Sequence, residues 1–337
     1  MNSLKIAVVG ATGMVGRTFL KVLEERPFEN ATYTLFSSAR SAGSVLKFMG
    51  GEYTVQELNE NSFDEGFDIA LFSAGGSTSE KFAPIAASKG CVVVDNSSQW
   101  RMDPNVPLVV PEVNPEDILN HKGIIANPKC STIQAMVALS PLQKKYGIKR
   151  VVYSTYQAVS GAGRAGYEDL ENGMKGEAPK KFPHPIAANV IPHIDVFLEN
   201  GYTKEEEKMI KETRKILHDD TMRVTATTVR VPVFNGHSES INVELGSAYD
   251  LKELCEVLKN AEGIKIVDNG ANNEYPMPII ATGTDYTYVG RIRRDESVEN
   301  GLNLWVVADN IRKGAATNAV QIAEALIGYW KSGKLAR

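Results

Sequence analysis

The feature that most constrains this chain is its opening run, a strand pattern that leads directly into a glycine-rich turn and a helix. Residues 4–9 form an apolar run, Gly10, Gly13 and Gly16 follow, and residues 18–25 predict the helix. The first glycine permits a tight turn, the second lets a pyrophosphate approach the backbone, and the third lets the helix pack on the strand. The sequence therefore predicts a Rossmann-type, dinucleotide-binding domain. The alternative is a glycine turn with a structural role only.

The end of the second predicted strand, residues 33–36, indicates which dinucleotide is bound. NAD enzymes place an Asp or Glu here for the ribose 2′-hydroxyl. This chain instead has Ser37, Ser38, Arg40 and Ser41. An arginine beside hydroxyl groups suits a 2′-phosphate, so we expect NADP. The alternative is a solvated loop arginine.

Further βα units predict that the parallel sheet continues. The pattern places strands over 68–73 and 91–95, with a helix over 80–88 between them. Ala74 and Gly75 follow the first of these strands, where small residues leave room for a ligand at the carboxyl edge of the sheet. They are therefore candidate neighbours of the cofactor.

A lone cysteine stands at a predicted strand-to-helix turn. Residues 123–126 predict a short strand, and an apolar helical run follows Cys130. Unpaired N–H groups and the dipole at a helix start favour a thiolate, lowering the thiol pKa from about 8.5 toward neutrality. Cys130 is a candidate nucleophile; the alternative is a buried, inert cysteine. Because Pro141 interrupts the helical run, we expect the helix to kink or end near Leu139.

After residue 146 the pattern changes from alternating strands and helices to strands paired through turns, which predicts an α+β domain on a mixed, largely antiparallel sheet. A helix over 204–217 begins with Thr203 and Glu206 in capping-box spacing. The last apolar helix has no partner in its own neighbourhood. We therefore expect one domain of residues 1–129 joined by 315–337, and a second of 130–314. The expected strands of the second domain cover residues 150–158, 223–234, 240–248, 284–293 and 302–308.

Two ionisable side chains flank an Asn-Gly turn at 235–236. If this turn closes a two-residue hairpin, Arg230 pairs with Ile241, and His237 lies on the same face as Arg230. An anion clamp and a proton carrier would then share one surface. Pro232 cannot donate to a strand ladder, so an edge strand or a bulge must be allowed. The alternative for His237 alone is a hydrogen-bonded structural histidine.

Composition excludes several classes of protein. A net charge of −4 without a basic block argues against nucleic acid as a main partner. Three scattered cysteines and five histidines without ligand spacing fit neither a disulfide framework nor a metal site. No segment approaches the apolar length of a membrane span, and no signal peptide precedes the first strand. We therefore expect a cytoplasmic protein without a metal.

Together, a cysteine nucleophile, a histidine, several arginines and an NADP-type fold predict one kind of reaction. A thiolate attacks an aldehyde, hydride leaves the thiohemiacetal for the nicotinamide, and phosphate or another nucleophile releases the thioester. His237 would take the proton at the hemiacetal step and return it in the reverse direction.

Five segments of the chain belong together in one family pattern: Gly10–Gly16, Ser97–Arg101, Asn127–Thr132, Gln157 with Ser160 and Gly161, and Arg230–His237. Together they resemble the aspartate-semialdehyde dehydrogenases of the kind found in Gram-positive bacteria. The resemblance covers essentially the whole chain. It implies NADP-dependent reductive dephosphorylation of 4-phospho-L-aspartate to L-aspartate 4-semialdehyde, in the biosynthesis of lysine, through diaminopimelate, and of methionine and threonine. It also implies a homodimer formed through the second domain.

The resemblance also implies roles for single side chains. Cys130 would form the acyl-enzyme, His237 would be the acid/base, and Gln157 would orient the substrate. Arg230 would bind the substrate carboxylate, and Arg101 with Lys208 the phosphate. Further candidates for the substrate are Asn127 and Glu205, the latter for the amino group. With Gly10, Ser37, Ala74 and Gly75 from the pattern above, the predicted cofactor contacts are Thr12, Gly13, Met14, Val15, Arg40, Ser41, Ser160, Gly161 and Asn310.

Without the resemblance, the sequence of residues 205–208 leads to a different prediction. By themselves they form a solvated first helical turn with an i,i+3 ion pair. The neighbouring Glu206 and Glu207 leave open which acidic residue faces the substrate.

Two rival functions remain. A sister enzyme would use the same chemistry on N-acetyl-glutamyl phosphate, although the segments 127–132 and 230–237 favour aspartyl phosphate. A non-catalytic NADP-binding regulator would instead use Cys130 as a structural or redox-sensing residue. Thiol alkylation at neutral pH distinguishes the regulator, in which Cys130 is inert.

Overall fold

The structure, a computed structural model, describes residues 3–337. It divides into two compact units. The first comprises the chain up to Pro128 together with Ala315–Arg337, and the second comprises Lys129–Gly314.

The first unit is built on a parallel sheet with the strand order β5-β2-β1-β6-β7-β8. Val8, Leu71 and Val94 are fully buried, because helices cover both faces of such a sheet and its strands become continuous apolar runs. This arrangement confirms the predicted Rossmann-type fold. A small antiparallel pair, β3 with β4, lies outside the sheet. The strands are β1 (Leu4–Val9), β2 (Ala31–Ser37), β3 (Val45–Phe48), β4 (Gly51–Thr54), β5 (Gln56–Glu57), β6 (Ile69–Phe72), β7 (Val92–Asp95) and β8 (Ile124–Ala126).

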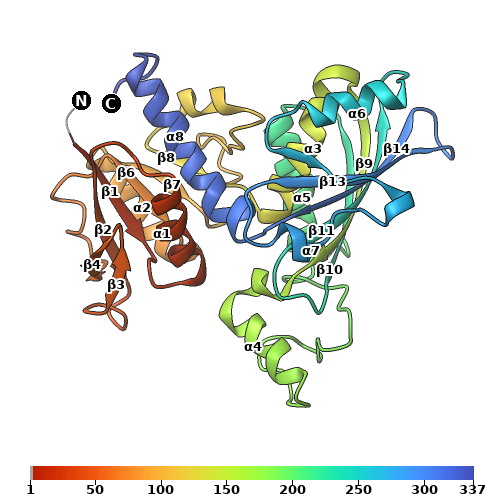
Figure 1. Cartoon of the computed structure of the whole chain (residues 1–337). Coiled ribbons are helices and arrows are strands. Elements are labelled where there is room, and N and C mark those ends of the chain that lie inside the picture. The colour runs from red at the N-terminus through yellow and green to blue at the C-terminus, as the bar shows by residue number, and fades with distance from the viewer. Residues whose placement is uncertain (1–2) are drawn as a thin grey trace. The chain divides into compact units, whose positions relative to one another are not determined.

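Among the described residues of this unit, the α-helices are α1 (Met14–Glu25), α2 (Gly76–Ser88) and α8 (Thr317–Lys331). The 3₁₀ turn η1 (Pro115–Asn120) also belongs to this unit, whereas the π-helical η4 (Arg312–Ala316), which precedes α8, spans the point in the chain where the second unit ends, at Gly314. Ala319, Ile322 and Leu326 of α8 are fully buried in the same apolar cluster as Val8 and Leu71. The C-terminal helix therefore packs into the core of the first unit (Figure 1).

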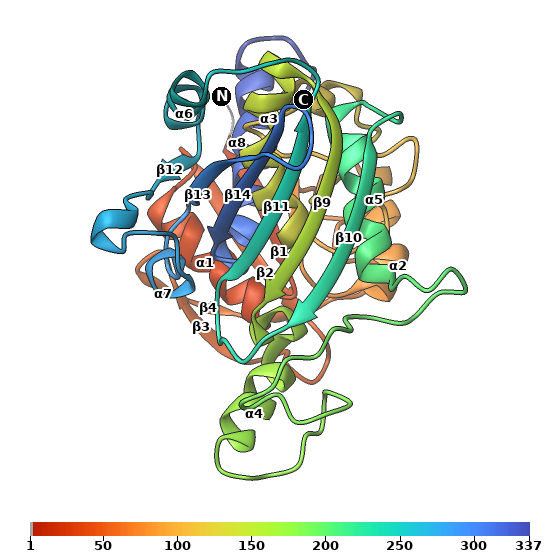
Figure 2. The same ribbon diagram turned by 90° about the vertical axis from the view of Figure 1, so that its right-hand side faces the viewer.

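The second unit is built on a mixed sheet with the order β10-β9-β11-β14-β13-β12. β9 is parallel to β10 and antiparallel to β11, and this mixture confirms the predicted fold class. The Tyr153 hydroxyl on β9 lies 3.0 Å from the Thr213 hydroxyl on the helix α5 (Lys204–Leu217). Figure 2 shows these strands toward the viewer, with α3 (Cys130–Tyr146) and α5 behind them. The strands are β9 (Ile148–Gln157), β10 (Arg223–Arg230), β11 (His237–Leu245), β12 (Ile264–Ile266), β13 (Thr287–Asp295) and β14 (Gly301–Ala308).

The helices of the second unit lie around this sheet. α5 begins at a capping box, as predicted: the Thr203 hydroxyl accepts from Glu206 N–H, and the Glu206 carboxylate accepts from Thr203 N–H. The helices and helical turns are α3 (Cys130–Tyr146), η2 (Val159–Ala162), α4 (Gly163–Gly173), α5 (Lys204–Leu217), α6 (Leu251–Lys259), η3 (Gly270–Asn272) and α7 (Pro278–Ala281).

The predicted hairpin between Arg230 and His237 is wrong. β10 and β11 do not pair, because β9 lies between them: Arg230 pairs with Gln157, and Ile241 pairs with Tyr153. The connecting residues cross the end of β9, where Val231 N–H donates to the Gln157 carbonyl. Pro232 lacks an N–H group and fits this irregular crossing better than it would fit a ladder.

The prediction that the helix after Cys130 could end near Leu139 is also wrong. α3 continues through Pro141 to Tyr146. A proline inside a helix removes one backbone hydrogen bond. Leu139 and Leu142 on either side are fully buried, and this apolar burial offsets the loss.

No helix among residues 3–337 has the length and apolar character needed to cross a membrane. Within the same residues, no cluster of three His, Cys, Asp or Glu side chains could hold a metal ion.

Candidate active site

A cavity of about 450 Å³ lies at the carboxyl ends of β1, β2 and β6 in the first unit. Met14 and Val15 begin α1, and Gly75 is the N-cap of α2. Most of the cofactor contacts predicted in the first unit line this cavity. Its lining residues are Val9, Gly10, Thr12, Gly13, Ser37, Ser38, Arg40, Ser41, Leu58, Ser73, Ala74, Thr78 and Phe82.

The glycines of this cavity leave space for a close approach of the backbone. Gly10 has φ +84°, and a Cβ there would lie 2.3 Å from the Ser73 carbonyl oxygen. A Cβ at Gly16 would lie 2.0 Å from the Gly10 carbonyl oxygen, so helix and turn can pack only without a side chain. The Thr12 and Ser37 hydroxyls lie 2.7 Å apart and join the glycine turn to the end of β2. These residues fit a bound dinucleotide.

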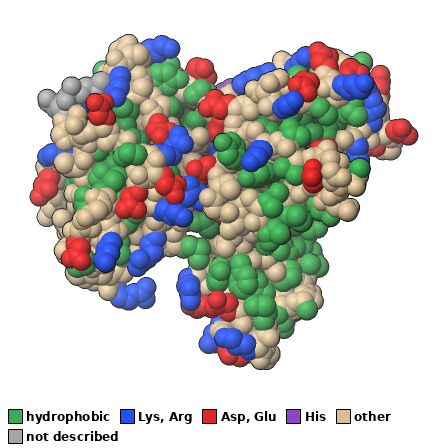
Figure 3. All heavy atoms as spheres, viewed as in Figure 1, with side chains coloured by type: hydrophobic (Ala, Val, Ile, Leu, Met, Phe, Trp, Pro, Cys, Tyr) green, Lys and Arg blue, Asp and Glu red, His purple; other side chains and the backbone are tan. Residues whose placement is uncertain are grey.

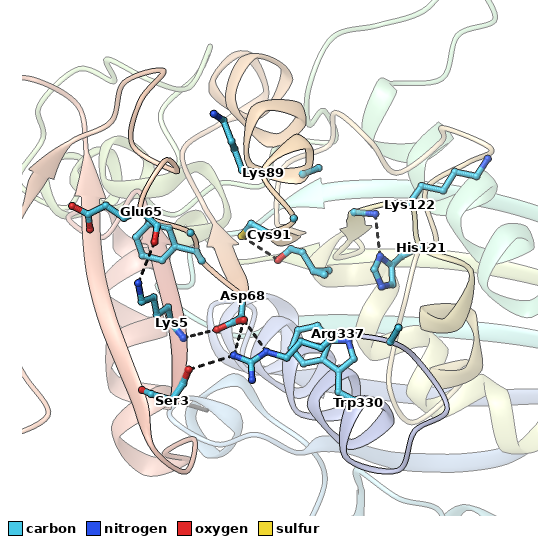
Figure 4. Close-up of a pocket in the computed structure, with 17 residues that line it drawn as sticks. Ser3, Lys5, Glu65, Asp68, Lys89, Cys91, His121, Lys122, Trp330 and Arg337 are labelled. Carbon is cyan, nitrogen blue, oxygen red and sulfur yellow. Dashed lines mark hydrogen bonds and ion pairs between the residues drawn. The ribbon is translucent and has the colours of Figure 1, made fainter. Parts of the chain in front are cut away.

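A second cavity of the first unit lies at the opposite, amino ends of the strands (Figure 4). Its volume is about 730 Å³. Lys5 Nζ donates to the Glu65 carbonyl, and the Arg337 guanidinium pairs with Asp68. Because these charges already have partners, and because ligands of open parallel sheets bind at the carboxyl ends, we do not assign this cavity a ligand.

Cys130 is the first residue of α3, as predicted, and it is partly exposed. The preceding residue, Lys129, is the N-cap and has an extended backbone. Gly314 lies directly against the cysteine, since a Cβ at Gly314 would come within 2.8 Å of Cys130 Cβ. The sequence pattern gives no indication of this contact. Any side chain at 314 would displace the sulfur-bearing residue.

His237 is the first residue of β11 and is completely buried. Its Nδ1 accepts a hydrogen bond from Ala158 N–H at 3.0 Å, which leaves the proton of the neutral ring on Nε2. Nε2 has no hydrogen-bond partner within residues 3–337. Burial lowers the pKa of His237 well below its usual range, and the positive charges of Arg230 and Lys129 lower it further. The ring is therefore neutral at neutral pH.

Arg230 ends β10 and is 5% exposed. Its Nη1 donates to the Ala158 carbonyl at 2.7 Å, whereas its Nε has no partner within residues 3–337. A Cβ at Gly161 would lie 2.9 Å from Arg230 Nη1 and 3.3 Å from His237 Nε2. Both side chains therefore flank the same glycine, although no hairpin brings them together.

Glu205 and Lys129 form a buried ion pair. Lys129 Nζ lies 2.5 Å from Glu205 Oε1. Burial alone would raise the pKa of Glu205, but Lys129, and then Lys208 and Arg230, outweigh burial and lower it. Lys129 N–H also donates to Glu212 Oε2 at 2.8 Å. The sequence pattern does not single out Lys129 or Glu212 as site residues. Its one signal for Lys129 is a cation directly before the candidate nucleophile.

The two acidic neighbours of Glu205 are engaged elsewhere. Glu206 closes the capping box and also accepts from Thr228 N–H at 3.0 Å. Glu207 pairs with Lys211 and accepts from Asn200. Of the three carboxylates in this turn, Glu205 is the one that pairs with Lys129.

The other predicted residues of the second unit have local partners. Gln157 donates to the Thr155 hydroxyl at 3.2 Å, and Lys208 pairs with Asp195 at 2.6 Å. Asn310 donates to the Ser160 hydroxyl at 3.0 Å and accepts from Gly236 N–H. The Asn310 side chain therefore ties Ser160 to the turn before His237.

Arg101 and Asn127 belong to the first unit. Arg101 Nε donates to the Asn127 carbonyl at 2.9 Å, and its Nη2 donates to the Asn96 carbonyl. The Asn127 side chain bonds to Asn96 and Asn318. These contacts fix the segment that leads into Cys130.

Glu239 lies two residues beyond His237 and is also completely buried. Burial raises its pKa well above the usual range of a carboxyl group. Neither carboxyl oxygen has a hydrogen-bond partner within residues 3–337. Burial therefore favours the neutral form of the Glu239 carboxyl group over the charged form that would balance the positive charges near His237.

Comparison with known proteins agrees with this geometry. Residues 5–121 match the family model "Semialdehyde dehydrogenase, NAD binding domain", and residues 139–313 match "Semialdehyde dehydrogenase, dimerisation domain". These matches place the chain among the semialdehyde dehydrogenases, which are NAD(P)-dependent oxidoreductases.

Individual relatives narrow the class. The chain is 64% identical over 333 residues to aspartate-semialdehyde dehydrogenase of Aquifex aeolicus, covering 96% of this chain and 98% of that protein. It also matches the crystal structure of aspartate semialdehyde dehydrogenase II complexed with ASA from Vibrio cholerae, with a TM-score of 0.92, 46% identity and coverage of 97% and 99%. A Candida albicans enzyme of the same name, solved with NADP, has a TM-score of 0.78, 27% identity and the same coverage. The chain belongs to the aspartate-semialdehyde dehydrogenase family.

Proposed function

We propose that this protein reduces 4-phospho-L-aspartate to L-aspartate 4-semialdehyde with NADPH and releases phosphate. The observation that carries the proposal is the position of Cys130 at the start of α3, in the same unit as the neutral His237 and the buried Arg230. The family membership of the chain supports the same reaction.

The chemistry follows from the properties of these side chains. The Cys130 thiolate attacks the acyl carbon, a thioester forms and phosphate leaves. The bound dinucleotide supplies the hydride that reduces this thioester. The neutral His237 ring donates a hydrogen bond from Nε2 to the oxygen that gains negative charge, both when the thiolate attacks and when the thioester is reduced. The first alkoxide collapses by expelling phosphate and the second by expelling the Cys130 thiolate, which releases the aldehyde, so the ring keeps its proton throughout.

The remaining roles concern the substrate. Arg230 would hold the substrate carboxylate and Glu205 its ammonium group, while Lys208 would meet the phosphate and Gln157 would orient the acyl group. Charged and amide groups of this kind are the natural partners of a phosphorylated amino acid. The roles of Arg101 and Asn127 toward the substrate stay predictions, as do those of Ser160, Gly161 and Asn310 toward the cofactor.

We further propose that the second unit forms a homodimer. Residues 139–313 match a dimerisation domain. Exposed apolar side chains on this unit include Phe197 and Ile279, and Figure 3 shows hydrophobic side chains gathered on its lower part. Exposed apolar patches of this kind mark interaction surfaces. The cytoplasmic location and the Gram-positive type stay predictions, because the relatives named above test neither.

Steady-state assays test the proposed reaction. In the reverse direction, the protein should reduce NADP with L-aspartate 4-semialdehyde only when phosphate or arsenate is present, because an acyl-enzyme needs an anionic acceptor. N-Acetyl-glutamate 5-semialdehyde, the aldehyde of the sister enzyme, should be a poor substrate. Faster turnover of that longer aldehyde would overturn the assignment.

Arg40 is expected to select NADP over NAD. It lines the cofactor cavity and is exposed there. Replacing Arg40 by alanine removes a charge-assisted contact worth about 1.5–3 kcal/mol, so the preference for NADP should fall roughly tenfold or more. The measurement is the ratio of kcat/KM for NADP to that for NAD. Arg223→Ala, a change at an exposed arginine of the second unit, serves as the control, and an unchanged ratio in Arg40→Ala would show that Arg40 has no such role.

A further inference from the structure

We propose that Lys129 is the counter-ion of Glu205. The Lys129 ammonium group occupies the position that the substrate ammonium would take, and it thereby sets how strongly the site selects an aminated substrate. This inference rests on the proposed function of the site. It assigns a specificity-determining role to Lys129, which belongs to the segment Asn127–Thr132 but is not among the predicted substrate contacts.

The ion pair of Lys129 and Glu205 is largely removed from water. The Glu205 side chain is 2% exposed and that of Lys129 is 17% exposed, with 2.5 Å between Nζ and Oε1. A carboxylate removed from water to this extent is strongly disfavoured unless a cation lies beside it. Without substrate, Lys129 meets this need.

Two other cations near Glu205, Lys208 and Arg230, contact different partners. Lys208 pairs with Asp195, and Arg230 Nη1 donates to the Ala158 carbonyl. Both influence Glu205 through space, but the contact with the carboxylate is made by Lys129.

The Lys129 side chain is flexible, although its backbone is fixed. Its backbone is fixed as the N-cap of α3 and by the hydrogen bond to Glu212. Its four-carbon stem is flexible, and its ammonium is the same chemical group as the α-ammonium of an amino acid. An arriving substrate ammonium must therefore share Glu205 with Lys129 or displace it.

This competition makes the site tolerant of substrates that lack the amino group. When a substrate lacks the amino group, Lys129 still neutralises Glu205, so binding leaves no buried charge unpaired. Without Lys129, an aminated substrate is the only bound partner that supplies the missing cation. The variant site then rejects substrates without an amino group more strongly, because a site discriminates best against an analogue that leaves a buried polar group unpaired.

The experiment compares two aldehydes that differ only in the amino group, L-aspartate 4-semialdehyde and succinate semialdehyde. The ratio of their kcat/KM values is measured at pH 8 with saturating NADP and phosphate. In Lys129→Met this ratio should rise about tenfold or more above that of the wild type, the size expected for one charge-assisted contact. A ratio that is unchanged or lower would overturn the proposal.

Two further variants control this comparison. Lys145→Met removes an exposed lysine that pairs with Glu253, and it should leave the ratio unchanged. Lys129→Arg keeps the positive charge and should keep the wild-type ratio, whereas a purely structural role of the lysine stem would not be rescued in this way. Because both aldehydes are assayed on the same protein sample, any inactive fraction cancels from the ratio.

Lys129→Met could fail to fold, because it leaves Glu205 buried without its partner. The double variant Lys129→Met with Glu205→Gln removes both charges and should fold. Its ratio should fall below that of the wild type, since no carboxylate remains to select the ammonium; a wild-type ratio in this protein would overturn the proposal. If the wild-type protein oxidises neither aldehyde, the proposed function itself fails, and this result is separate from any change in the ratio.

Discussion

Cys130→Ala should lose turnover by several orders of magnitude while binding NADPH almost as tightly as the wild type. Removing a covalent nucleophile removes the whole acyl-enzyme route, and losses of this size are typical of such changes. Cofactor binding should persist because the lining of the cofactor cavity comes entirely from the first unit, whereas Cys130 begins α3 in the second. The measurements are kcat and a fluorescence titration with NADPH.

The other two cysteines are suitable controls for this prediction. Cys91 is buried, and desolvation raises the pKa of its thiol. Cys255 is partly exposed, and partial burial with nearby acidic side chains raises the pKa of its thiol also. Neither thiol is poised to react, so Cys255→Ala should keep full activity. Activity of Cys130→Ala within tenfold of the wild type would refute the covalent role.

Arg230→Lys should lower kcat/KM about a hundredfold even though the charge is retained. A guanidinium can donate to the Ala158 carbonyl through Nη1 and still grip a carboxylate with its other N–H groups, whereas a single ammonium group cannot reproduce this fork. A misplacement of the reacting carbonyl by about an ångström can cost on the order of a hundredfold, and this loss appears in kcat as well as in KM.

Arg223→Lys is the matched control for Arg230→Lys. Arg223 begins the same strand, β10, but it is exposed and pairs with Glu244. Its replacement should change neither kcat nor KM. Thermal unfolding and NADPH binding of Arg230→Lys should remain near the wild type. Full activity in Arg230→Lys would show that the carboxylate is held by another residue.

The parts of the fold that depend on neighbouring residues could be predicted from the sequence. The turn from Gly10 to Gly16, the helix start at Cys130 and the capping box of Thr203 and Glu206 each depend on a few consecutive residues. The order of the strands in the second sheet could not be predicted, because β10 and β11 are close in sequence but β9 inserts between them. Such pairing depends on contacts between distant segments, which a local pattern does not encode.

The same distinction applies to the candidate site. Motif spacing indicated Cys130, Arg230 and His237 as residue types suited to the chemistry. The environment that sets their charges comes from remote segments: Arg230 donates to a carbonyl 72 positions away, and His237 accepts from an N–H 79 positions away. The ion pair of Lys129 with Glu205 is likewise a tertiary contact. No spacing rule predicts these partners.

Mass spectrometry of the acyl-enzyme tests the covalent mechanism most directly. The wild-type protein is mixed with L-aspartate 4-semialdehyde and NADP without phosphate. We expect about one NADPH per site, a mass increase equal to one aspartyl group on the peptide that contains Cys130, and loss of this group when phosphate is added. An adduct on any other residue, or an unchanged mass after one NADPH per site has formed, would contradict the proposed mechanism.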